Sequence, residues 1–121
     1  MEHVRLRDPE EMNVLSLLLA GYLESALSDI DLQARLDGIE GGIWIRAGKM
    51  WTTLLLDGGG RVELVTGRAE GARASVEGEM DVLLGVVTGG PLVLPVLTGK
   101  IGLGGNLLFL LRLLPLLTAG G

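Results

Sequence analysis

The sequence predicts one domain built of both helices and strands, with helices at each end and most of the strands between them. Apolar residues recur at spacings of three and four over residues 12–26 and again over 80–87, which is the period of helices. Between residues 43 and 77 they alternate instead, which is the period of strands. A chain of 121 residues, 48% of them hydrophobic, is the size of one domain with one core, so we treat 1–121 as a single domain.

The first helix is predicted to begin at Asp8. This residue can cap the helix, Pro9 suits the first helical position, and Glu11 stands three residues after the cap. A second cap over residues 28–31 opens a short helix that Gly38 ends. The apolar face of the first helix consists of Met12, Leu15, Leu18, Leu19, Tyr22, Leu23 and Ala26.

A hairpin is predicted from two alternating segments joined by a two-residue turn, which pairs Ala47 with Met50. The third strand keeps its apolar residues on the same face only if Leu56 pairs with Val62, and this pairing leaves a five-residue connection or a bulge between them. The remaining elements are a fourth strand at 72–77, a helix at 79–87, a short helix or turn at 92–97, a fifth strand at 100–104, and a last helix capped by Asn106 that runs to Leu114, where Pro115 kinks or ends it.

Charge is distributed unevenly along the chain. Between Met80 and Gly121 the only charged residues are Asp81, Lys100 and Arg112. A solvated surface normally carries more charge than this, so the second half must be covered by the core, a ligand, a partner or a membrane. The net charge of −5 argues against nucleic-acid binding.

Several other classes of function lack support in the sequence. The only histidine, His3, lies in a terminus that we expect to be frayed, no cysteine is present, and no serine has a nucleophile-elbow pattern around it. The glycines at 102–105 lack the full spacing of a dinucleotide loop. No signal-peptide pattern and no apolar run of about 20 residues is found, so we expect a cytoplasmic protein without catalysis, metal or cofactor.

Two segments of the second half resemble the sterol carrier protein 2 family. Residues 99–108, Gly-Lys-Ile-Gly-Leu-Gly-Gly-Asn-Leu-Leu, are similar to its strand-to-helix segment, and 76–89 are similar to its strand, capped helix and Thr-Gly stop. The resemblance covers residues 8–117. It implies an α+β fold with a five-stranded, mostly antiparallel sheet, helices packed on one face, and an apolar tunnel for fatty acids, acyl-CoA or sterols. It implies no catalytic residues.

The tunnel is expected between the inner face of the sheet and the later helices. On a helical projection the last helix is apolar all round, and we expect one face of it to meet the sheet or ligand. The ligand-binding residues predicted in this way are Ile45, Leu54, Leu64, Met80, Leu84, Val87, Leu103, Leu107, Leu110 and Leu114. The outer face predicted to dock onto a partner or membrane consists of Leu108, Phe109, Arg112 and Leu116.

The function that follows is binding and exchange of an apolar lipid. The alternative is an interaction domain without a ligand, which uses the uncharged second half as an oligomer interface. The partners expected are an apolar lipid, transiently a membrane, or a homo-oligomer, and no nucleic acid. Trp44 and Trp51 fall on the opposite face of the sheet, where they either pack across the strands or contact a ligand.

Overall fold

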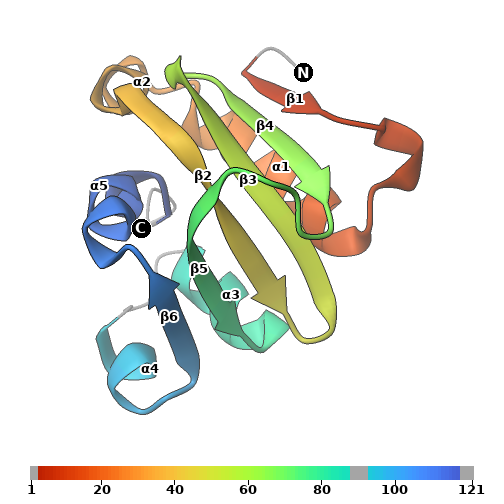
Figure 1. Cartoon of the computed structure of the whole chain (residues 1–121), viewed down its shortest axis with the longest axis vertical. Helices are drawn as coiled ribbons and strands as arrows, with labels where there is room; N and C mark the ends of the chain where they lie inside the picture. Colours follow the sequence, from red (N-terminus) through yellow and green to blue (C-terminus); the bar gives the residue numbers. More distant parts are fainter. Residues whose placement is uncertain (1–2, 88–92, 118–121) are drawn as a thin grey trace.

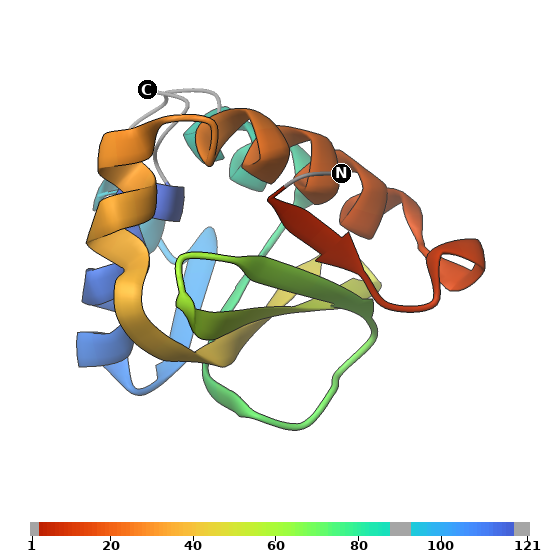
Figure 2. The ribbon, with the colours of Figure 1, turned by 90° about the horizontal axis from the view of Figure 1, so that it is seen from above.

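The computed structural model describes residues 3–87 and 93–117, apart from the side chains of residues 86, 87, 93, 94, 114 and 117. It is an α+β fold, as predicted, in which one sheet carries helices on one face (Figure 1). Seen from above, α1 runs along this face, while the chain between β4 and β5 bows out from the opposite face (Figure 2). The helices and strands are β1 (Val4–Leu6), a 3-10 turn (Pro9–Glu11), α1 (Val14–Ala26), α2 (Ile30–Leu36), β2 (Asp37–Ala47), β3 (Met50–Gly59), β4 (Val62–Thr66), β5 (Ala72–Gly78), α3 (Met80–Val87), α4 (Val93–Leu97), β6 (Ile101–Gly105) and α5 (Leu107–Leu117).

The sheet has six strands in the order β1-β4-β3-β2-β5-β6, one more than predicted. The pairs β2–β3, β3–β4 and β5–β6 are antiparallel, while β1–β4 and β2–β5 are parallel. The additional strand is β1, so the expected fraying around His3 is wrong. The Glu24 carboxylate accepts hydrogen bonds from the backbone N–H groups of His3 and Val4, at 3.0 and 2.9 Å, and holds this strand in place.

The register predicted for the central strands is confirmed. Ala47 pairs with Met50 across the turn, and Leu56 pairs with Val62. Five residues separate this pair, the first three of them still part of β3. The Asp57 carboxylate accepts hydrogen bonds from the backbone N–H groups of Gly59 and Arg61. Ile43 and Ile45 of β2, Leu54 and Leu56 of β3, and Val62 and Leu64 of β4 therefore share one face.

The start of α1 differs from the prediction. Asp8 has a left-handed backbone (φ 50°) with no side-chain cap bond, and only a 3-10 turn follows it. Asn13 caps the helix instead, because its side chain accepts a hydrogen bond from the Ser16 N–H at 2.8 Å. The same amide side chain donates to the Trp51 carbonyl at 3.0 Å, so the cap also fastens α1 to β3.

The last helix also differs at its end. Asn106 caps α5 through the Phe109 N–H, as predicted, but the helix continues beyond Leu114, through Pro115 to Leu117. A proline in the last turn removes only one backbone hydrogen bond, and packing of the surrounding apolar side chains compensates for it. The helix is therefore three residues longer than the sequence indicated.

The outer face of the sheet is covered in part by the β4–β5 connection. Trp44 and Trp51 pack edge to face across β2 and β3, with ring centroids 6.4 Å apart. The indole N–H of Trp44 donates to the Ala69 carbonyl, and the guanidinium of Arg68 lies 4.9 Å from the ring centre of Trp51. The cross-strand packing predicted for these two tryptophans is confirmed.

Candidate ligand-binding site

The inner face of the sheet is a continuous apolar surface formed by cross-strand rows. One row joins Ala74, Ile43, Leu54 and Leu64 across β5, β2, β3 and β4. These four side chains are at most 5% exposed. The neighbouring row runs from Leu103 on β6 through Val76 and Ile45 to Thr52.

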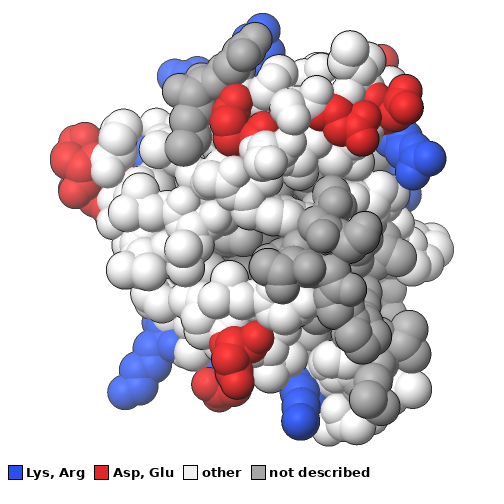
Figure 3. Space-filling model, turned by 180° about the vertical axis from the view of Figure 1, so that it is seen from behind, with Lys and Arg blue, Asp and Glu red and all other residues white. Residues whose placement is uncertain are grey.

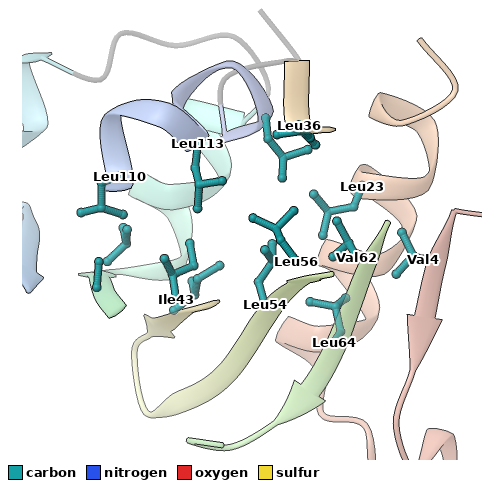
Figure 4. Packing of buried hydrophobic residues seen from close by; sticks show 14 of the residues in the cluster. Val4, Leu23, Leu36, Ile43, Leu54, Leu56, Val62, Leu64, Leu110 and Leu113 are labelled. Atoms are coloured by element: carbon teal, nitrogen blue, oxygen red, sulfur yellow. The ribbon is translucent and has the colours of Figure 1, made fainter. Parts of the chain in front are cut away.

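Helices α1, α2 and α5 close this face from above. Leu23 and Leu36 point down from α1 and α2 toward Leu54 and Leu56, as Figure 4 shows. Leu110 and Leu113 of α5 point toward the part of the sheet that carries Ile43 (Figure 4). All seven of these residues are at most 5% exposed, so the space between sheet and helices is lined by aliphatic side chains.

A cluster of polar groups lies in this interior beneath the start of α1. The hydroxyl of Ser16 lies 2.9 Å from the hydroxyls of both Thr52 and Thr66, and Thr52 donates to the Val65 carbonyl. Within the described residues no buried side-chain nitrogen or oxygen lacks a hydrogen-bond partner. The three hydroxyls are therefore satisfied by one another and by neighbouring protein atoms. The interior would hold a ligand mainly by contact area rather than by hydrogen bonds.

The predicted ligand-binding residues separate into two groups by exposure. Ile45, Leu54, Leu64 and Leu110 lie in the core, and Met80 is partly buried against it. Leu84, Leu103 and Leu107 are 37%, 41% and 53% exposed, so α3, β6 and the first turn of α5 leave apolar surface open. The side chains of Val87 and Leu114 lie outside the described residues.

The predicted outer face of α5 is half wrong. Leu108 and Arg112 are exposed, as expected, but Phe109 and Leu116 are buried at 2% and 0%. The true inward face also contains Leu113, which is fully buried and was not among the predicted residues. Helix α5 is thus rotated about its axis relative to the predicted orientation. Its Phe109 side chain packs against the core and under Arg73, whose guanidinium lies 5.4 Å from the centre of the Phe109 ring.

No feature of the sequence fixes this rotation. Every residue of α5 except Arg112 is apolar, so several rotations would bury an apolar stripe equally well. The hydroxyl of Tyr22, which donates to the Leu116 carbonyl at 2.8 Å, joins α1 to α5 and helps select the observed one. That contact spans 94 residues of sequence and has no local signal.

The helical side of the molecule is largely uncharged in its middle. Viewed from that side, Lys, Arg, Asp and Glu lie mainly around the rim, and the surface is hollowed near the centre (Figure 3). Exposed apolar side chains of α1 contribute to the uncharged area: Val14, Leu17 and Leu18 are 59%, 52% and 45% exposed. Leu18 therefore lies outside the buried face on which the sequence placed it.

A groove of about 620 Å³ lies at the β1 edge of the sheet, the edge opposite β6, beside the β3–β4 connection. Its walls include Arg5 and Arg61 together with Asp57 and Glu63, so they carry both signs of charge. It shares no residue with the predicted ligand-binding set, and its lining mixes charged with apolar side chains.

Comparison with solved structures identifies the fold. No family model matches the sequence, and the comparison with curated proteins gives no match. The structure is similar to the UbiJ-SCP2 ubiquinone synthesis protein, with a TM-score of 0.66 and 18% identity over 91% of this chain and 96% of that one. It is also similar to sterol carrier protein domain 2 of Helicoverpa armigera, with a TM-score of 0.63 and 15% identity over 94% and 92%. The chain has the fold of sterol carrier protein 2 domains, which the sequence predicted.

Two further neighbours show that this fold occurs in different settings. The structure of palmitated SCP2L2 from Aedes aegypti has a TM-score of 0.59 and 15% identity, over 88% of this chain and 95% of that one. A stereoselective inverting sec-alkylsulfatase from a Pseudomonas species has a TM-score of 0.61 and 17% identity, but the match covers 69% of this chain and only 14% of the sulfatase. In the described part of the chain, no helix is long and apolar enough to cross a membrane.

Proposed function

We propose that this domain binds and exchanges an apolar lipid, a fatty acid, a fatty acyl-CoA or a sterol-like molecule, in a tunnel between the sheet and the helices. The observation that carries the proposal is the aliphatic interior above Ile43 and Leu54, together with the exposed apolar side chains of Leu84, Leu103 and Leu107. A ligand of matching chemistry would cover these side chains. The palmitated state named for the Aedes aegypti neighbour supports an acyl chain as one such ligand.

The aliphatic lining favours binding by contact area. Burial of each methylene contributes about 0.8 kcal/mol relative to water, so a chain of about 16 carbons gains on the order of 12 kcal/mol. Ordering and association cost about 4–15 kcal/mol. Relative to a bilayer, where the chain is already dry, the net gain is near zero. The domain would thus exchange lipids with membranes rather than store them.

We propose that binding occurs without catalysis, in the cytoplasm. His3, the chain's one histidine, lies 3.4 Å from the Gln33 amide beside β1, away from the predicted ligand-binding residues. Among the described residues, no group of three His, Asp or Glu side chains is arranged to hold a metal ion. The polar chemistry near the interior is the hydroxyl cluster of Ser16, Thr52 and Thr66, whose members bond to one another.

The test begins with native mass spectrometry of freshly purified protein, in which a bound lipid adds its mass. Titration with a series of fatty acids should then show affinity rising with chain length. Leu84→Glu places a charge at an exposed apolar residue of α3 that we predict to contact the ligand. It should weaken binding at least about tenfold, since a charge is costly beside an apolar ligand. The matched control is Leu17→Glu on α1, at a more exposed position, which should leave affinity unchanged.

The second candidate function is an interaction domain without a ligand. The observation that favours it is the set of exposed leucines on α1, α4 and α5, which includes Leu17, Leu97 and Leu108. It predicts protein that purifies without lipid, shows affinity independent of chain length or no binding, and elutes as an oligomer. Such a result would replace the lipid-binding proposal.

A further inference from the structure

The outward side of α5 joins exposed leucines to positive charge. Leu108 and Leu111 are 74% and 62% exposed, and Arg112 stands beside Leu108 on the same side of the helix. Leu97 at the end of α4 is 77% exposed, and the exposed Lys100 precedes β6. We call these five residues the α5 surface. The elements that carry them lie together at one edge of the molecule (Figure 1).

The charge of this region has the opposite sign to the rest of the chain. Residues 82–121 contain Lys100 and Arg112 and no acidic residue, whereas residues 1–81 contain fifteen acidic and eight basic residues. Arg73, exposed on β5, adds a third cation near the start of α5, where its side chain covers Phe109. None of these three cations forms an ion pair with a described residue.

We infer that the α5 surface is a docking face for an anionic lipid bilayer. The leucines can enter the region between headgroups and acyl chains, as the apolar side of an interfacial helix does. Arg112 can extend its aliphatic stem over the leucines and place its guanidinium on a lipid phosphate. An anionic surface attracts this edge and repels the acidic remainder of the molecule, so charge favours the same orientation of the docked domain as the leucines do.

Charge complementarity separates this face from the other exposed apolar stripe. Val14, Leu17 and Leu18 on α1 are comparably exposed, but α1 contains no basic residue. An apolar stripe without cations would bind neutral and anionic bilayers equally well. The inference goes beyond lipid binding in the interior, because docking requires only surface residues and can be measured on protein that holds no ligand.

The experiment is flotation of the full chain with vesicles of phosphatidylcholine alone and of phosphatidylcholine mixed with phosphatidylglycerol. Binding is expected to the anionic vesicles and to weaken as salt is added. Each cation at an anionic surface strengthens binding about fivefold, so the double variant Lys100→Glu with Arg112→Glu should bind at least about 25-fold more weakly. The variant Leu108→Ser with Leu111→Ser should lose about tenfold for each leucine. All these positions are exposed, so thermal melting should remain unchanged.

The matched control is Val14→Ser with Leu17→Ser on α1, which removes similar apolar area from a surface without cations and should keep full binding. Equal binding to neutral and anionic vesicles, or an equal loss in the α1 control, would overturn the inference. So would a wild-type dimer that Leu108→Ser with Leu111→Ser converts to a monomer without any vesicle binding, because a second copy would then occupy the face. Fatty-acid affinity, measured on the same variants, should not change, which separates failure of docking from failure of lipid binding.

Discussion

Leu113 and Leu111 allow a direct test of how α5 is seated. Both are leucines in the middle of the same helix, yet Leu113 is fully buried and Leu111 is 62% exposed. Leu113→Ala removes the equivalent of three methylene groups, worth about 0.8 kcal/mol each, and leaves a cavity between α5 and the sheet. With the cavity included, the free energy of unfolding should fall by about 3–5 kcal/mol. Leu111→Ala should change it by no more than about 0.5 kcal/mol.

The measurement is urea unfolding of lipid-free protein, supported by thermal melting. For a domain of this size, Leu113→Ala should lower Tm by about 10–20 °C, and Leu111→Ala by about 2 °C or less. A cost below about 1 kcal/mol for Leu113→Ala, or similar costs for the two variants, would refute the observed rotation of α5. If added fatty acid restores much of the stability lost in Leu113→Ala, a ligand fills the new cavity, and Leu113 borders the lipid site.

Three further substitutions test other parts of the fold. Thr52→Val removes a buried hydroxyl that bonds to Ser16, and should cost about 1–2 kcal/mol in urea unfolding with little change in fatty-acid affinity; no loss of stability would show that the hydroxyl cluster is dispensable. Gly42→Ala would place a Cβ atom 2.9 Å from the Leu54 carbonyl oxygen, so it should lower Tm by about 5 °C or more, and an unchanged Tm would contradict the close approach of β2 and β3. Glu24→Gln weakens the charge-assisted bonds that hold β1, so hydrogen exchange of the β1 amides should accelerate while the core amides stay protected; equal acceleration throughout would mean that β1 is integral to global unfolding.

The central strands are the part of the molecule that local sequence decided. In a hairpin the turn length fixes the register, and a strand's two-residue period then assigns every side chain to a face. The pairing of Ala47 with Met50 and of Leu56 with Val62 followed from these rules, and the structure has both. The inward positions of Ile45, Leu54 and Leu64 were predictable for the same reason.

Helix boundaries were less well determined. Asp8 and Asn13 are both good capping residues, and the sequence around Asp8 fits a cap better because Pro9 and Glu11 follow it. The choice of Asn13 depends on the Trp51 carbonyl, which receives the other hydrogen bond of the same side chain. Strand β1 likewise has its partner, β4, almost 60 residues further along the chain, and three residues give no pattern of their own.

By itself the sequence determined the class of fold, the inner face of the sheet and the shortage of charge in the second half, because each depends on composition or on a short period. Tertiary structure alone decided the rotation of α5. An amphipathic helix carries its orientation in its polar face, but α5 has one charged residue, and its leucines are chemically equivalent until they are packed. Shape then selects among them: Phe109, Leu113 and Leu116 fit against the core, while Leu107, Leu108 and Leu111 are left outside. Close packing is a property of the assembled interior, so no rule of spacing along the chain could supply that choice.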